Sequence, residues 1–119
     1  MAEALPRRLL KLEGLVLFAA GIALYIDADF SIVALIILFL APDLSALGYL
    51  VNKRVGATTY NAVHTEALPI ALGTAGLLAN SEVAVQVALI WLAHIGIDRV
   101  LGYGLKYPTD FGDTHLQRV

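Results

Sequence analysis

Apolar residues along the chain fall into four long stretches that are separated by short polar breaks. Each stretch is close to the roughly 20 residues that a helix needs to cross the hydrocarbon core of a bilayer. The pattern predicts helices over about 9–27, 30–51, 55–79 and 82–105, followed by a short polar C-terminal tail over 106–119. Connections of only a few residues make consecutive helices antiparallel. The predicted fold is therefore all-α, a single domain of residues 1–119 that forms a four-transmembrane-helix up-down bundle.

The composition favours lipid over water around these helices. Of the 119 residues, 59% are hydrophobic and 15% are charged, and the mean hydropathy is +0.76. A soluble bundle buries only one stripe of each helix and must cover the other faces with polar groups. Eight basic and ten acidic residues are too few for that. We therefore expect membrane lipids as the immediate neighbours of the helices.

The basic residues indicate which side of the membrane each end faces. They lie at the N-terminus, in the second break, or at and beyond the end of the last helix: Arg7, Arg8, Lys11, Lys53, Arg54, Arg99, Lys106 and Arg118. The first and third breaks carry acidic residues instead, Asp27, Asp29 and Glu82. Because basic segments stay on the cytoplasmic side, both termini are predicted to be cytoplasmic.

The absence of cysteine and the net charge exclude several classes of site. Without cysteine, a disulfide, an iron–sulfur cluster and a thiolate metal site are all impossible. The net charge of -2 leaves no basic surface for nucleic acid, whose phosphates require clustered Lys and Arg. Haem is not expected, because a bundle this small would have to open widely to admit a porphyrin. No bound nucleotide is expected either.

Ionisable side chains interrupt three of the apolar stretches. A charge at mid-bilayer costs at least about 2.5 kcal/mol, so such groups normally face the bundle interior and find partners there. At a rise of about 1.5 Å per residue, four of them lie about 12–18 Å from the basic residues that mark the cytoplasmic end. These four are Asp43 in the second helix, His64 in the third, and His94 and Asp98 in the fourth. The sequence therefore predicts one polar layer that opens toward the cytoplasm.

Histidines and aspartates without cysteine match the ligand set of a catalytic zinc site, in which three protein ligands leave a position for water. Zinc or another divalent metal is the expected cofactor, and the candidate ligands are His64, His94, His115 and Asp43. Asp43 or Asp98 is a candidate general base or a carboxylate that orients a histidine, and Arg99 is a candidate partner for an anionic substrate. His115 reaches the site only if the tail folds back as a lid, and a disordered tail would leave it outside.

The same residues also allow functions without catalysis. His94 with Asp98, and His64 with Asp43, would form a hydrogen-bonded plug that holds the helices together. Interhelical hydrogen bonds in membranes average only about 0.6 kcal/mol, which is less than the cost of inserting several ionisable groups. A third alternative is proton or solute movement along these side chains, which in four helices would require a homo-oligomer.

Five stretches of sequence carry a resemblance to a known family. They are Leu40-Ala-Pro-Asp-Leu-Ser45, Tyr60-Asn-Ala-Val-His-Thr65, Trp91-Leu-Ala-His-Ile-Gly-Ile-Asp-Arg99, Leu101–Pro108 and Phe111–Leu116. Together they resemble small bacterial membrane proteins classed as a domain of unknown function, over nearly the whole length. The resemblance implies a four-helix fold in the bacterial inner membrane and brings no established activity.

A looser similarity concerns the order of the polar residues. Pro42-Asp43, His64-Thr65, and His94 with Asp98 are similar to the PDxD, HRxxTHS and HxxxD motifs of bacterial membrane-bound metal-dependent hydrolases. The resemblance implies that Asp43, His64, His94 and Asp98 are the ligand or catalytic set. The chain lacks the second histidine of the THS element and the second aspartate after Pro42. The favoured function is a metal-dependent hydrolase-like enzyme acting on an amphiphilic substrate, and the alternative is a non-catalytic membrane protein.

Overall fold

A computed structural model describes residues 4–118, and every regular element in that range is helical, as predicted. The elements are α1 (Leu5–Asp27), α2 (Ile32–Leu38), the 3-10 helix η1 (Ala41–Leu50), α3 (Lys53–His64), α4 (Ala67–Leu78), α5 (Glu82–Leu101) and α6 (His115–Arg118). Within this part of the chain, three segments are long and apolar enough to cross a membrane. They are α1, α5, and α2 together with η1 over Ile32–Leu50.

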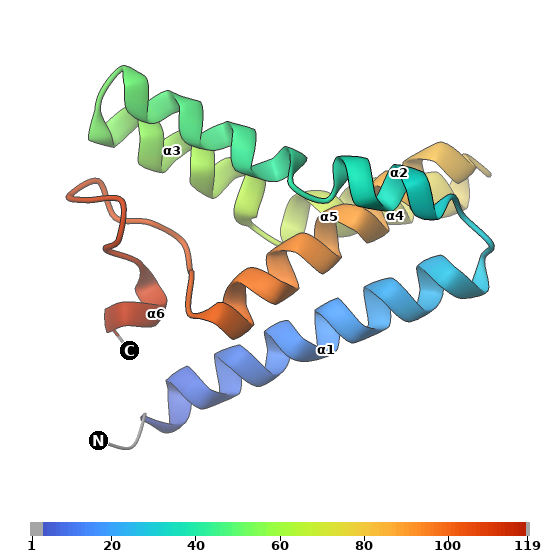
Figure 1. Cartoon of the computed structure of the whole chain (residues 1–119), viewed down its shortest axis with the longest axis horizontal. Coiled ribbons are helices and arrows are strands. Elements are labelled where there is room, and N and C mark those ends of the chain that lie inside the picture. Colours follow the sequence, from blue (N-terminus) through green and yellow to red (C-terminus); the bar gives the residue numbers. More distant parts are fainter. Residues whose placement is uncertain (1–3, 119) are drawn as a thin grey trace.

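Helix α5 is the centre of the fold. It packs against α1 on one side and against α4 on another, while η1 packs against α3 (Figure 1). Small residues let α1 and α5 approach closely. A Cβ added at Gly96 would lie 2.5 Å from the carbonyl oxygen of Gly14 and 2.6 Å from the amide nitrogen of Phe18. No larger residue fits at Gly96 without a shift of the α1 backbone.

Two of the predicted continuous helices are divided, and each division lies four residues before a proline. Helix α2 ends at Leu38, four residues before Pro42, and the chain continues as the 3-10 helix η1. Helix α3 ends before Thr65, which is extended at φ -87° and ψ 135° and lies four residues before Pro69. A proline ring clashes with the carbonyl four residues earlier and offers it no N–H. The prediction of a single helix over 55–79 was therefore wrong, whereas the segment predicted over 30–51 changes from α to 3-10 and continues as one candidate span over Ile32–Leu50.

Two other predicted boundaries shift by about one helical turn. Helix α1 begins at Leu5, because Pro6 lies in the first turn, where a helix needs no N–H from it. Helix α5 ends at Leu101, because Gly102 takes a left-handed conformation with φ 93° and caps the helix. Residues beyond Gly102 therefore belong to the tail, which is longer than predicted.

The polar tail folds back onto the helices. Lys106 and Thr114 pair as an antiparallel bridge, and α6 follows directly. Asn61 of α3 holds the start of the tail with two hydrogen bonds, accepting from the Lys106 amide at 2.6 Å and donating to the Lys106 carbonyl at 2.7 Å. Arg7 of α1 donates to the carbonyl of Leu116 at 2.7 Å. The tail is thus fixed to two helices at once.

An ion pair closes the tail on itself. Arg118 donates two hydrogen bonds to the Asp113 carboxylate, at 2.9 and 2.6 Å. These bonds, with one from Thr109, lower the pKa of Asp113 to about 2. Both chain ends and the turn between η1 and α3 lie at the same end of the long axis (Figure 1).

Candidate metal centre

Four side chains from η1, α3 and α5 converge beneath the folded tail. Asp43, His64, His94 and Asp98 each offer one ligand atom, and the four atoms lie within 4.8 Å of one another. The side chains of His64 and His94 are only 3% and 1% exposed, Asp98 is 16% exposed, and Asp43 is 49% exposed. The group could hold a metal ion, with Asp43 on its open side.

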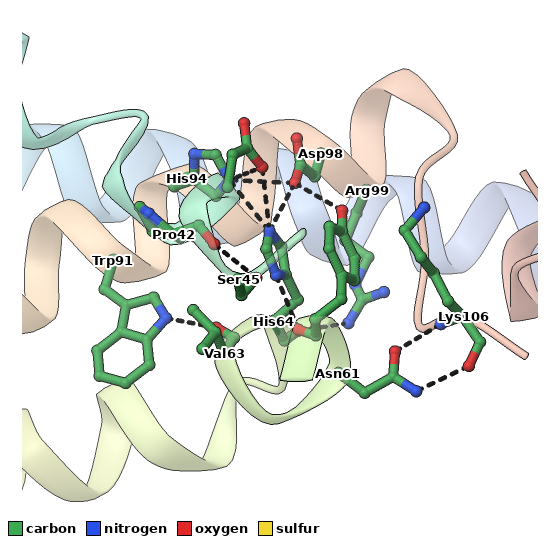
Figure 2. A network of polar contacts seen from close by, with 12 residues as sticks. Pro42, Ser45, Asn61, Val63, His64, Trp91, His94, Asp98, Arg99 and Lys106 are labelled. Carbon is green, nitrogen blue, oxygen red and sulfur yellow. Dashed lines mark hydrogen bonds and ion pairs between the residues drawn. The ribbon is translucent and has the colours of Figure 1, made fainter. Parts of the chain in front are cut away.

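The separations between these atoms are those of ligands around one small cation. The Nε2 atoms of His64 and His94 are 3.2 Å apart (Figure 2). Asp43 Oδ1 lies 3.4 Å from the first and 3.1 Å from the second, and Asp98 Oδ2 lies 3.4 and 3.2 Å from them. Tetrahedral zinc bonds of about 2.0–2.1 Å place neighbouring ligand atoms about 3.3–3.4 Å apart. Five of the six separations therefore suit a common central ion.

The proline-induced breaks bring the ligands to this layer. Asp43 follows Pro42 in the first turn of η1, and His64 is the last residue of α3, directly before the break at Thr65. His94 and Asp98 are one turn apart on α5 and share a face. The sequence therefore uses two interrupted helices and one continuous helix to assemble the group.

The protonation of His64 follows from its other ring nitrogen. His64 Nδ1 lies 2.9 Å from the carbonyl oxygen of Tyr60, which only accepts, so Nδ1 carries the proton. In the neutral imidazole, Nε2 then presents a lone pair to the centre of the group. The Tyr60 ring stacks on His64 with centroids 3.7 Å apart and fixes its orientation. A hydrogen bond from the second ring nitrogen to a backbone carbonyl, as His64 Nδ1 makes to Tyr60, is typical of metal-ligating histidines.

His94 is held mainly by packing. Its Nδ1 is buried next to the backbone of Phe39 and makes no hydrogen bond of good geometry. The Phe39 ring meets the imidazole edge to face, with centroids 5.6 Å apart. Phe39 lies in the break between α2 and η1, so the same interruption that places Asp43 also supports His94.

Two predicted site residues lie outside this group. Arg99, which was predicted as a partner for an anionic substrate, is buried and donates to the carbonyl of His64 at 3.2 Å, behind the imidazole. His115 was predicted as a ligand, but its Nδ1 accepts from the Leu105 amide at 2.8 Å, within the tail. Burial and the Arg99 charge lower the pKa of His115.

A pocket of about 380 Å³ adjoins the open side of the group, and part of its wall comes from the tail. Its lining includes Asp43, Tyr60, Asp98, Lys106 and Phe111. Tyr60 and Lys106 were not predicted as site residues. Tyr60 lies one turn before His64 on the same helix face, which was a usable signal. No spacing in the sequence pointed to Lys106, because its position depends on how the tail folds.

Comparison with known proteins gives a family but no activity. No curated protein and no solved structure matches the chain. Residues 7–119 match the family described as Domain of unknown function (DUF4260). Because this match includes every helix and the folded tail, the chain belongs to that family.

Proposed function

We propose that this protein is a four-pass membrane protein whose His/Asp group binds one divalent metal ion, zinc or a similar ion, and that it hydrolyses an amphiphilic substrate. The observation that carries the proposal is the set of five ligand-atom separations between 3.1 and 3.4 Å.

Exposed apolar side chains support the membrane. Ile36, Ile37, Leu47 and Leu50, on α2 and η1, are between 61% and 84% exposed. Large apolar patches of this kind are rare on soluble monomers, whereas lipid solvates them. Helices α3 and α4 together supply the fourth pass. The break between them lies against protein, where its backbone groups find partners such as Arg99.

The charge distribution supports an orientation with both termini in the cytoplasm. Arg7 lies in the first turn of α1, Lys53 begins α3 and Arg118 ends α6. These three helix ends lie at the same end of the long axis (Figure 1). The turns at Asp27–Asp29 and Asn80–Glu82 carry no basic residue. By the positive-inside rule, the end with the folded tail faces the cytoplasm of a bacterial inner membrane.

Proton counting favours a metal over a hydrogen-bonded plug. With His64 Nε2 unprotonated, the four inward-facing atoms are served by one ring proton, on His94, and by the Tyr60 hydroxyl, which donates to Asp98 Oδ2 at 3.5 Å. A plug would leave the two carboxylates without a balancing charge unless both buried imidazoles were protonated, and burial of a charge is costly. A divalent cation satisfies the lone pairs of the imidazoles and balances both carboxylates.

The chain's own residues suit hydrolysis. A divalent metal at such a site lowers the pKa of bound water to about 7 and polarises a substrate carbonyl or phosphoryl oxygen. Asp43, the half-exposed carboxylate, is placed to accept a proton at the pocket side. Asp98 and both histidines are too enclosed for that role and act as ligands. Arg99 positions His64 through its carbonyl.

A second, apolar pocket supports an amphiphilic substrate. It measures about 340 Å³ and is lined by Leu38, Ala41, Pro42, Val63, Val87, Ile90 and Trp91. It uses the same elements as the metal group, one turn earlier along α5. An acyl chain in this pocket would place its polar end close to Asp43, which follows Pro42 directly.

Metal analysis of the protein purified in neutral detergent tests the proposal. We expect one metal ion per chain in the wild type and none in His64→Ala or His94→Ala. His115→Asn is the matched control, because His115 lies outside the group, and it should keep its metal. A wild type that carries no metal and gains no thermal stability from added zinc, cobalt or manganese would overturn the proposal.

Chromogenic esters and phosphate esters with short and long alkyl chains test the hydrolysis. The wild type should prefer the long-chain compounds. Asp43→Asn should lose most of the hydrolysis rate. Asp110→Asn makes the same substitution outside the metal group and should leave the rate unchanged. Full metal loading without hydrolysis of any compound would reduce the protein to a metal-binding membrane protein.

A further inference from the structure

Lys106 is a buried cation in the wall of the polar pocket. The residue is only 4% exposed, and its Nζ lies 3.6 Å from the centroid of the Phe111 ring and 4.4 Å from that of Tyr60. One ammonium proton goes to the carbonyl of Phe111, at 2.6 Å. The other two N–H groups of the ammonium can donate hydrogen bonds to a ligand in the pocket.

No carboxylate of residues 4–118 forms an ion pair with this ammonium within 4.0 Å. Burial lowers the pKa of Lys106, and the more distant charges of Asp98 and Asp43 oppose that shift. Keeping an ammonium here is therefore costly for the fold alone. A ligand that supplies negative charge would remove the cost.

The charge balance of the pocket depends on the metal. Asp43 and Asp98 contribute two negative charges, a divalent ion cancels them, and Lys106 then leaves the pocket with an excess of one positive charge. Bound cations are often the largest charges in a site and reverse its local preference. The loaded pocket therefore attracts anions, whereas the metal-free pocket repels them.

We propose that the pocket binds an oxyanion, a phosphate or a carboxylate, between the metal group and Lys106. This inference rests on the proposed metal site and adds the substrate class, an anionic amphiphile or a free anion of the same chemistry. Lys106 takes the place that the sequence suggested for Arg99, which lies behind His64. Because Lys106 belongs to the tail, the pocket binds the anion only when the tail is folded back onto the helices.

Cobalt(II) provides a test in which the two proposals fail separately. Cobalt bound to the purified full-length chain gives visible absorption bands, and inorganic phosphate that reaches the metal shifts them. Absence of the bands would overturn the metal site. Bands that do not change with millimolar phosphate, compared with the same concentration of chloride, would overturn only the oxyanion site.

Two variants identify Lys106 as the anion partner. Lys106→Met keeps the apolar stem over the Phe111 ring, so the cobalt bands should stay while the dissociation constant for phosphate rises about tenfold or more. Lys106→Arg should restore most of the affinity. Unchanged affinity in Lys106→Met would overturn the proposal.

A control separates charge from tail docking. Arg7→Ala removes the hydrogen bonds to the carbonyls of Leu116 and Gln117 but leaves the Lys106 ammonium in place. It should change phosphate affinity less than threefold. If Arg7→Ala weakens phosphate as much as Lys106→Met does, Lys106 acts only by holding the tail, and the proposal is wrong.

Dodecyl phosphate distinguishes a lipid headgroup from a free anion. Its affinity in neutral detergent micelles is compared with that of inorganic phosphate, using the same cobalt bands. Dodecyl phosphate that binds at least ten times more tightly supports a lipid-like ligand whose chain uses the apolar pocket. Equal affinities support a free oxyanion, and binding of neither overturns the site.

Discussion

His64 and His94 face each other across the contact between α3 and α5, with their Nε2 atoms 3.2 Å apart. Two imidazole nitrogens approach this closely when a proton or a metal ion lies between or beside them. Because His64 Nδ1 is committed to the Tyr60 carbonyl, its Nε2 has only a lone pair to offer. A metal ion bound between these side chains would therefore stabilise the folded chain in addition to any role in catalysis.

Zinc should therefore stabilise the folded chain. At a free zinc concentration one hundred times its dissociation constant, binding to the folded state alone adds about 2.7 kcal/mol to the free energy of unfolding. Denaturation of the detergent-solubilised protein, with and without a chelator, measures this difference. His94→Ala should show none of it. A chelator effect of the same size in both proteins would mean that zinc acts elsewhere.

The common level of the four candidate ligands was predictable because an approximate helical rise is enough to estimate it. Counting residues from the basic ends placed Asp43, His64, His94 and Asp98 in one layer, and the structure brings them together. The count holds from Arg54 to His64, because α3 is an unbroken α-helix between them. It is only approximate for Asp43, which is reached along the 3-10 helix η1, and for His94 and Asp98, which were counted from beyond the end of α5 at Leu101. Roles within the group, such as ligand or base, depend on exposure, which the sequence does not give.

The interrupted helices and the tail were not predictable in the same way. The mean hydropathy of a stretch of about 20 residues does not reveal a short break inside it. The helix over 55–79 was therefore predicted to continue through Thr65, although Pro69 marked the site of the interruption. Lys106 meets Asn61 through contacts 45 residues apart in the chain. His115 has the chemistry of a ligand, and only the hydrogen bond from the Leu105 amide shows that its lone pair is already used.

Because α1 and α5 approach closely, adding one methyl group at Gly96 should strongly destabilise the fold. In Gly96→Ala, the new Cβ would meet the Gly14 carbonyl oxygen at 2.5 Å, a backbone atom that cannot rotate away. Overpacking of this kind costs about 1–3 kcal/mol. Thermal denaturation in detergent should show it. Gly112→Ala is the control, because nothing lies within 4 Å of its added Cβ. Equal stability of the two variants would contradict this packing.

The side-chain amide of Asn61 should contribute measurably to docking of the tail. Asn61→Ala removes both hydrogen bonds to the Lys106 backbone and should weaken docking of the tail by about 1–2 kcal/mol. Hydrogen exchange at the Lys106 amide should then become about tenfold faster. Thr58→Ala, which removes only an exposed hydrogen bond within α3, should leave that amide protected. Equal exchange in wild type and Asn61→Ala would show that the tail is held elsewhere.

Docking of the tail should also depend on pH through His115. Its Nδ1 accepts from the Leu105 amide, so protonation breaks that bond, and burial beside Arg99 lowers the pKa below the ordinary 6.5. As pH falls through 6.5, an undocked tail takes up the proton before a docked one does. Docking is therefore constant above about pH 6.5 and weakens progressively below it.

The chain has no cysteine, so a fluorophore on Gly112→Cys reports on the tail alone. Its anisotropy should fall between pH 6.5 and pH 5 as the tail gains freedom. His115→Asn keeps a hydrogen-bond acceptor in place without a titrating ring, so its anisotropy should stay level. Asp113 cannot produce the change, because its pKa is about 2 and it stays ionised throughout. The same fall in His115→Asn would assign the pH response to another group.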